Sequence, residues 1–220
     1  ETGMITYMRT DSVNLSALAI GDTKSEICRT FGNAYWKKRQ YTTKSVGAQE
    51  AHEAIRPTSM SNRTIESDDS KEKKLYDLIW KRTIASQMAD AKLEKTTITI
   101  SQDKTPEEFI ATGKIILFDG FLKIYSTDDE EQKEILPAVK IKQEVGTDEI
   151  NAIQCFTAPP QRYNESMLVK KLESLGIGRP STYAPTISTI IKRAYVVKES
   201  RTGKEREYFV LTLKEDKISS

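Results

Sequence analysis

Histidine and cysteine are scarce in this sequence of 220 residues. The single histidine, His52, excludes a metal site built from several histidines. Cys28 and Cys155 lie too far apart in the sequence to form a metal-ligand motif. Two unclustered cysteines are typical of a reducing compartment, so we expect a cytoplasmic protein.

Long apolar runs are absent as well. No stretch of about 18 apolar residues is present, which excludes a membrane-spanning helix, and no signal peptide is visible. The sequence opens with Glu1-Thr2-Gly3 instead of a methionine, so we expect a piece of a longer protein. Charged residues make up 30% and hydrophobic residues 37%, which indicates one or two soluble globular domains.

Charge is unevenly distributed along the chain. Residues 93–155 carry 13 acidic and 7 basic side chains, a net charge of −6. Residues 156–220 carry 12 basic and 7 acidic side chains, a net charge of +5. The acidic segment is poorly suited to bind a polyanion, whereas the basic segment is a candidate. The alternative interpretation is an ordinary random distribution of charged side chains over the protein surface.

A short string near the start places Tyr7 two residues before Arg9, and Asp11 and Ser12 follow. A phenol needs help to attack a phosphate near neutral pH, because its ordinary pKa is about 10. A nearby guanidinium gives that help by holding the phosphate and favouring the developing charge. In an extended segment Tyr7 and Arg9 share one face, whereas in a helix they point apart. The string predicts either a phosphate-attacking tyrosine or a half-buried tyrosine beside a solvated arginine.

Two further stretches within the first 60 residues are candidates for contact with phosphate or nucleic acid. His52 and Arg56 are four residues apart, so one helical turn would let both side chains grip one phosphate. A structural or solvent-facing histidine is the alternative. The basic cluster 37–39 lies beside three aromatic residues, Tyr35, Trp36 and Tyr41, which suits single-stranded nucleic acid or a solvated loop.

Capping residues and apolar spacing predict the regular elements. We expect helices from the Ser16 N-cap to Phe31 and over residues 71–89. Alternating apolar residues predict strands within 93–157, with Asp119-Gly120 as a hairpin turn and a strand over 139–145. We expect further helices over 164–175 and 180–193, then a hairpin formed by residues 195–197 and 208–213.

That order, helix, glycine turn, helix and hairpin, is typical of a winged helix-turn-helix. Arg179, Ser181 and Thr182 lie at the start of its second helix, where free N–H groups favour a phosphate. Capping of the helix by the same hydroxyls is the alternative.

Three strings stand far apart along the chain: Ile-Thr-Tyr-Met-Arg-Thr-Asp-Ser (5–12), Ala-His-Glu-Ala-Ile-Arg-Pro-Thr (51–58) and Leu-Glu-Ser-Leu-Gly-Ile-Gly-Arg-Pro-Ser-Thr-Tyr-Ala-Pro-Thr-Ile-Ser-Thr-Ile (172–190). They resemble, in the same order, three motifs of type IA DNA topoisomerases, the first being the active-site signature. The bacterial topoisomerase I branch is the most similar.

The resemblance implies a role for several residues. Tyr7 corresponds to the nucleophile that cleaves one DNA strand and stays joined to its 5′-phosphate. Arg9 corresponds to the cation beside the scissile phosphate, and His52 to the histidine on a nearby backbone phosphate. The family religates the strand without ATP and relaxes negative supercoils. The other residues implied to serve DNA binding are Asp11, Arg56, Arg179, Ser181 and Thr182.

The resemblance also implies parts that this sequence does not contain. The family places an acidic metal-binding domain upstream, with an Asp-x-Asp-x-x-Gly cluster, and no such cluster is found here. We therefore expect Mg²⁺ and the general acid to be held outside this chain, with that N-terminal domain as a partner. The chain alone is expected to bind single-stranded DNA without relaxing supercoils.

The expected fold is α+β and multidomain. Residues 1–92 form a mainly helical domain with the catalytic tyrosine, 93–157 an antiparallel β hinge segment, and 158–220 a winged-helix-like DNA-groove domain. In this interpretation the protein is cytoplasmic and associated with the nucleoid. One alternative is a non-catalytic single-stranded nucleic-acid-binding module, in which Arg179 matters and Tyr7 does not. Another is a site-specific recombinase, although its tyrosine lies late in the catalytic domain.

Overall fold

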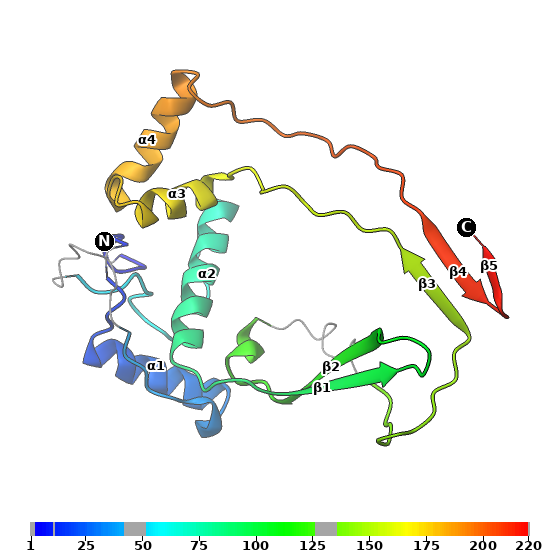
Figure 1. The fold of residues 1–220 in the computed structure, drawn as a ribbon. Helices are drawn as coiled ribbons and strands as arrows, with labels where there is room; N and C mark the ends of the chain where they lie inside the picture. Colours follow the sequence, from blue (N-terminus) through cyan, green and yellow to red (C-terminus); the bar gives the residue numbers. More distant parts are fainter. Residues whose placement is uncertain (1–2, 11, 42–51, 126–135, 220) are drawn as a thin grey trace. The chain divides into compact units, whose positions relative to one another are not determined.

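The computed structural model describes residues 3–10, 12–41, 52–125 and 136–219 (Figure 1). Contacts within the chain group its residues into two units, Glu1–Ala138 and Val139–Ser220. Four α-helices and antiparallel strands confirm the expected α+β class. The expected domain boundaries near residues 92 and 157 stay a prediction.

The first unit begins with helix α1 (Ala17–Thr30) and the short 3₁₀ helix η1 (Asn33–Tyr35). The predicted N-cap is confirmed, because the Ser16 hydroxyl accepts a hydrogen bond from the Ala19 N–H at 3.2 Å. Gly32 follows the helix with φ of +95°, a conformation that glycine adopts without a steric penalty. Local sequence signals therefore determine both ends of α1.

Helix α2 (Ser70–Ser86) supplies half of the buried residues in the core cluster of this unit. Its N-cap is Asp69, whose carboxylate accepts from the Lys71 N–H at 2.7 Å. Trp80 is 1% exposed, and its indole N–H donates to the carbonyl of Met60 at 2.9 Å. Tyr76, Ile84 and Ala85 of α2 belong to the same core cluster. Its remaining members come from α1, from the chain before α2 and from the segments after it (Ile27, Met60, Met88 and Ile124).

Strands β1 (Lys92–Ser101) and β2 (Glu108–Phe118) form an antiparallel pair. The predicted hairpin turn at Asp119-Gly120 is wrong, because 3₁₀ helix η2 (Gly120–Ile124) follows β2 instead of another strand. Gly120 permits a close approach between backbones, since a Cβ there would lie 2.6 Å from the Ala89 oxygen. Ile124 is buried in the core cluster, so the apolar run 121–125 covers α2 and does not extend a sheet.

Helices α3 (Glu165–Ser174) and α4 (Pro180–Lys192) belong to the second unit. Both were predicted from their first residues: Asn164 caps α3 by accepting from the Met167 N–H at 2.8 Å, and Pro180 opens α4. Gly176 and Gly178 in the connecting turn have φ of +70° and +81°, which explains two glycines in so short a segment.

The second unit also contains a three-stranded antiparallel sheet in the order β3 (Glu149–Ile153), β4 (Val210–Lys214) and β5 (Lys217–Ser219). Two predictions are wrong here. Residues 139–145 contain no strand, and residues 195–197 do not pair with β4 as a winged helix would require. The hairpin turn instead lies at Glu215 and Asp216, whose φ values of +49° and +59° suit a two-residue turn.

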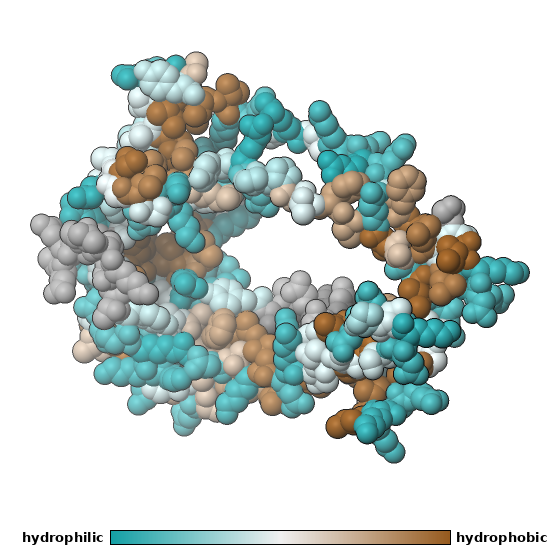
Figure 2. Space-filling model, in the orientation of Figure 1, coloured by the Kyte–Doolittle hydropathy of each residue, from teal (hydrophilic) through white to brown (hydrophobic). Residues whose placement is uncertain are grey.

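Apolar side chains remain exposed on both strand pairs. Ile153, Leu211 and Ile218 are exposed on the sheet of the second unit, where Figure 2 shows brown surface. Ile110 and Leu117 are exposed on β2. None of the helices described is both long and apolar enough to span a membrane.

Candidate active site

Two segments from the start of the chain and from residues 54–58 lie side by side in the first unit. An antiparallel bridge joins Ile5 to Pro57, and the Thr6 N–H donates to the Arg56 carbonyl at 2.9 Å. The Thr6 hydroxyl donates to the carbonyl of Ala54 at 2.8 Å and accepts from the Arg56 N–H at 3.0 Å. Thr6, the residue before Tyr7, is therefore hydrogen-bonded to the segment that follows His52.

A partly buried ion pair stabilises this second segment. Arg56 is 9% exposed, and its Nε and Nη2 donate to the two carboxylate oxygens of Glu53 at 2.8 and 3.0 Å. Its Nη1 donates to the Pro57 carbonyl at 2.8 Å. Glu53 in turn accepts from the N–H of Ser16, the N-cap of α1, at 2.9 Å. We call this group the Glu53–Arg56 clamp.

Burial and hydrogen bonds act in opposite directions on the Glu53 carboxyl. Burial opposes its ionisation, but the hydrogen bonds from Arg56 and the Ser16 N–H outweigh burial and hold the pKa of Glu53 below its ordinary value. The carboxylate is therefore the form that the clamp stabilises.

Tyr7 lies near both His52 and Arg9. The ring centroids of Tyr7 and His52 are 5.9 Å apart, and the Arg9 Cζ is 6.0 Å from the Tyr7 centroid. Tyr7 is 62% exposed, so its hydroxyl is open to a large substrate. The Arg9 N–H donates to the Tyr7 carbonyl at 3.0 Å, so residues 7–9 form a tight turn. A turn agrees with the expectation that Tyr7 and Arg9 lie in a strand or loop and not in a helix.

Asp11 and Arg56 were also predicted to belong to the site in this region. Asp11 lies outside the described residues. Arg56 was expected to grip a phosphate together with His52, but all three of its nitrogen groups are engaged within the clamp. The sequence analysis gave Glu53 and Thr6 no role. The Glu53–Arg56 spacing of three residues was the available signal for the ion pair.

The predicted residues of the second unit meet at the start of α4. Arg179 is exposed, and its Nη1 donates to the Gly178 carbonyl at 3.0 Å. The Thr182 hydroxyl accepts from the Arg179 N–H at 2.8 Å, so it serves the capping role that was the alternative interpretation. Ser181 is exposed one residue before it. A Cβ at Gly178 would lie 3.1 Å from the Thr182 hydroxyl, which favours glycine in this turn.

Within the ranges given above, no three residues of the histidine, cysteine, aspartate and glutamate types come together to hold a metal ion.

Comparison with known proteins identifies the family. A family model described as DNA topoisomerase matches residues 1–207. The chain belongs to this family, and the resemblance inferred from the three motifs is confirmed. DNA topoisomerase 1 of Zymomonas mobilis is 46% identical over 210 residues, covering 90% of this chain and 17% of the relative. DNA topoisomerase 1 of Rickettsia prowazekii is also 46% identical, covering 90% of this chain and 27% of the relative.

A viral relative and a solved structure agree with this assignment. The DNA topoisomerase 1 of Acanthamoeba polyphaga mimivirus, described as prokaryotic in type, is 43% identical and covers 98% of this chain and 27% of the relative. The structure of full-length topoisomerase I from Thermotoga maritima matches with a TM-score of 0.68 and 33% identity, covering 90% of this chain and 32% of that chain. The chain thus spans a third or less of each protein compared here.

Proposed function

We propose that this chain contains the strand-cleaving tyrosine of a type IA DNA topoisomerase. The observation that carries the proposal is the exposed Tyr7 ring near two groups, the His52 ring centroid at 5.9 Å and the Arg9 Cζ at 6.0 Å. A substrate with a repeating phosphate backbone fits a hydroxyl that is open to solvent beside a fixed cation. The family assignment adds DNA as the substrate class.

The proposed reaction is a reversible transesterification. The Tyr7 oxygen forms a bond to the scissile phosphorus, and the bond from phosphorus to the 3′-oxygen breaks. The proton of the phenol is lost, and the leaving 3′-oxygen takes up a proton to become a hydroxyl. The product is a phosphotyrosine joined to the 5′ end of the broken strand. Attack by the 3′-hydroxyl reverses both steps, so no ATP is needed to reseal the strand.

The neighbouring side chains have separate roles in this proposal. Arg9 stabilises the charge that develops on the phosphate, and His52 contacts a phosphate of the same strand. Asp11 orients this network. Arg56 was first assigned to DNA, but its buried pairing with Glu53 supports a positioning role. Through Thr6 it holds the Tyr7 segment against the segment that follows His52.

The start of α4 supplies the proposed contact with single-stranded DNA. Arg179 is exposed there, and Ser181 and Thr182 lie in the first turn, where backbone N–H groups favour a phosphate. The surplus of basic residues in 156–220 supports this assignment. In the complete enzyme we assign these groups to the binding of single-stranded DNA, and the enzyme works in the cytoplasm on nucleoid DNA.

Further parts of the active site are proposed to lie outside this chain. Mg²⁺ and the acid that protonates the leaving oxygen belong to an N-terminal metal-binding domain, which is the partner of Tyr7 in the complete enzyme. Mg²⁺ there neutralises the charge of the phosphates near the cleavage point. The relaxation of negative supercoils is therefore assigned to the longer protein.

A labelled oligonucleotide tests the proposal in the longer protein that includes the upstream domain. After quenching with detergent, label on the 5′-phosphate side of the break should migrate with the protein, and Tyr7→Phe should remove this covalent species. Lys95→Gln, on the distant strand β1, is the matched control and should retain it. A covalent species that survives in the Tyr7→Phe protein would contradict the proposal.

A non-catalytic single-stranded nucleic-acid-binding module remains the second candidate. The exposed Arg179 at the start of α4, in a basic segment, favours it. The two candidates differ in what they predict for Tyr7. For a non-catalytic module, Arg179→Gln would weaken DNA binding, whereas Tyr7→Phe in the longer protein would change neither binding nor strand cleavage.

A further inference from the structure

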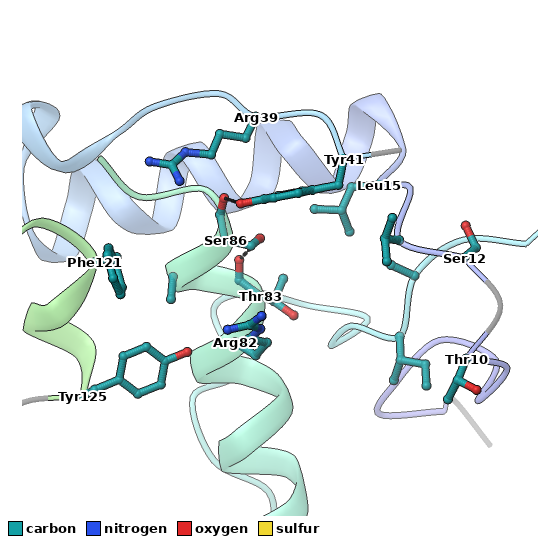
Figure 3. A pocket seen from close by; sticks show the side chains of 14 residues that line it. Thr10, Ser12, Leu15, Arg39, Tyr41, Arg82, Thr83, Ser86, Phe121 and Tyr125 are labelled. Atoms are coloured by element: carbon teal, nitrogen blue, oxygen red, sulfur yellow. Dashed lines mark hydrogen bonds between the residues drawn. The ribbon is translucent and has the colours of Figure 1, made fainter. Parts of the chain in front are cut away.

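A cavity of about 590 Å³ lies in the first unit, beside the segment that continues from Tyr7 (Figure 3). Thr10 and Ser12 line it on one side, and the second half of α2 lines it on another. Its volume is in the range of small-ligand sites. None of the roles assigned above to Tyr7, Arg9, His52 or the start of α4 uses this cavity.

The described residues that line the cavity carry two positive charges. The described residues around it include Arg39 and Arg82 but no aspartate or glutamate. Arg39 is paired with Asp90 at 2.5 Å, which leaves its charge partly neutralised. Arg82 is exposed, and within the described residues it has no ion pair or hydrogen bond. The cavity therefore offers an arginine that is available to an anion.

Three aromatic rings border the same space: Tyr41, Phe121 and Tyr125. Tyr41 and Tyr125 are 42% and 43% exposed, so part of each ring is open for contact. The Tyr41 hydroxyl donates to the Ser86 carbonyl at 3.0 Å, which fixes its ring against α2. In Figure 3 the hydroxyl end of Tyr125 points toward the part of α2 that carries Arg82. Rings beside a cation suit a ligand with a planar base and a phosphate.

We propose that this cavity binds one nucleotide of a DNA strand, with its base against the Tyr41 and Tyr125 rings and its phosphate at Arg82. The proposal rests on the proposed function and adds a base-contacting subsite to the unit that carries the nucleophile. Thr10 lies three positions after Tyr7 in the sequence, so their Cα atoms are at most about 11 Å apart. A strand bound at Tyr7 reaches the cavity within a few nucleotides.

Photo-crosslinking of the 220-residue chain locates the base directly. Single-stranded oligonucleotides carry one 5-iodouracil at successive positions, and mass spectrometry identifies the attached residue. Attachment at Tyr41 or Tyr125 is expected for a narrow range of iodouracil positions. No attachment in the cavity at any position would overturn the proposal.

Binding of the oligonucleotide by a matched pair of variants tests the phosphate contact. Arg82→Gln is expected to weaken binding by about 3- to 10-fold. It should also reduce the slope of log binding constant against log salt concentration by about one, because one phosphate contact is lost. Lys81→Gln removes the neighbouring cation of α2, which pairs with Asp77 and does not line the cavity. It should change binding by less than about twofold. Equal DNA affinities of these two variants would contradict the proposal. Thermal unfolding of each variant serves as the control that both proteins are folded.

Binding of a mononucleotide and the positions of the crosslinks distinguish a wrong subsite from a wrong proposed function. If the mononucleotide dTMP occupies the cavity as tightly as the oligonucleotide, the site takes a free nucleotide and the assignment to a strand is wrong. If only the subsite is wrong, crosslinks at Tyr7 or at the start of α4 persist without any in the cavity. If the proposed function itself fails, the covalent species in the longer protein does not depend on Tyr7.

Discussion

At the scale of single residues, the Glu53–Arg56 clamp connects parts of the site that are far apart in sequence. Arg56 is almost fully buried, and replacing one partner of such an ion pair leaves the other charge uncompensated. Glu53 also accepts from the N–H that begins α1. A change at Glu53 therefore affects the ion pair and the start of the helix together.

Glu53→Gln should lower the free energy of unfolding by about 2 kcal/mol, because it leaves the Arg56 guanidinium without its counter-charge. Urea unfolding of the 220-residue chain measures this change. Asp77→Asn is the matched control, since it breaks the more exposed Asp77–Lys81 pair on α2 and should cost about 0.5 kcal/mol or less. Similar losses in both variants would contradict the account of the clamp.

The pKa of Glu53 gives this pair a pH dependence. A carboxyl with a lowered pKa in the folded state adds stability above its ordinary pKa and loses it as the pH falls through the folded value. The difference in unfolding free energy between the native protein and Glu53→Gln should therefore be constant near neutral pH. It should shrink as the pH falls below about 4.5, and a difference unchanged down to about pH 2 would contradict the prediction.

At the scale of elements, local signals predicted the helices well. Ser16 was identified as an N-cap, and residues 164 and 180 as the starts of two further helices, because helix starts depend on residues close together in sequence. The strand partners were not predictable in the same way. Strand β4 pairs with β3, about 60 residues earlier, and nothing near residues 195–213 reveals that partner.

Gly120 shows why a local turn signal was misleading. Asp-Gly is typical of a hairpin, but here the glycine is needed because its backbone lies against residues 89–91. The Tyr7 site shows the same limit. The sequence placed Tyr7, Arg9 and His52 in recognisable motifs, but it could not show that the Arg56 guanidinium pairs with Glu53.

Gly120→Ala should destabilise the first unit by about 2 kcal/mol or more, because the new Cβ would lie 2.6 Å from backbone atoms at a φ of +51°. Gly21→Ala in α1 is the control. Nothing lies within 4 Å of a Cβ there, so the helix should gain about 0.5 to 1 kcal/mol. Thermal unfolding measures both, and a Gly120→Ala protein as stable as the native chain would contradict the close approach.

At the scale of the whole molecule, this chain matches only part of each longer relative. It covers 17% of the Zymomonas protein and 27% of the Rickettsia protein. Exposed Ile110 and Leu117 on β2, and Ile153 and Leu211 on the sheet of the second unit, are typical of surfaces that pack against further protein. We therefore assign the proposed activity to the longer protein, to which this chain is proposed to contribute the tyrosine and one DNA-binding segment.

The 220-residue chain alone should bind single-stranded DNA but leave negatively supercoiled plasmid unchanged in the presence of Mg²⁺, because the proposed metal site and general acid lie outside it. Gel electrophoresis of the plasmid measures this outcome. The longer protein with the upstream domain is the positive control. Relaxation by the isolated chain would show that its own residues suffice for the reaction.

The most direct test is to identify the amino acid that carries the cleaved DNA. The longer protein is reacted with a single-stranded oligonucleotide and denatured, and nuclease and protease digestion leaves a nucleotide on one peptide for mass spectrometry. The account predicts a nucleotide joined through its 5′-phosphate to Tyr7. A nucleotide on any other residue, or one joined through its 3′-phosphate, would contradict it.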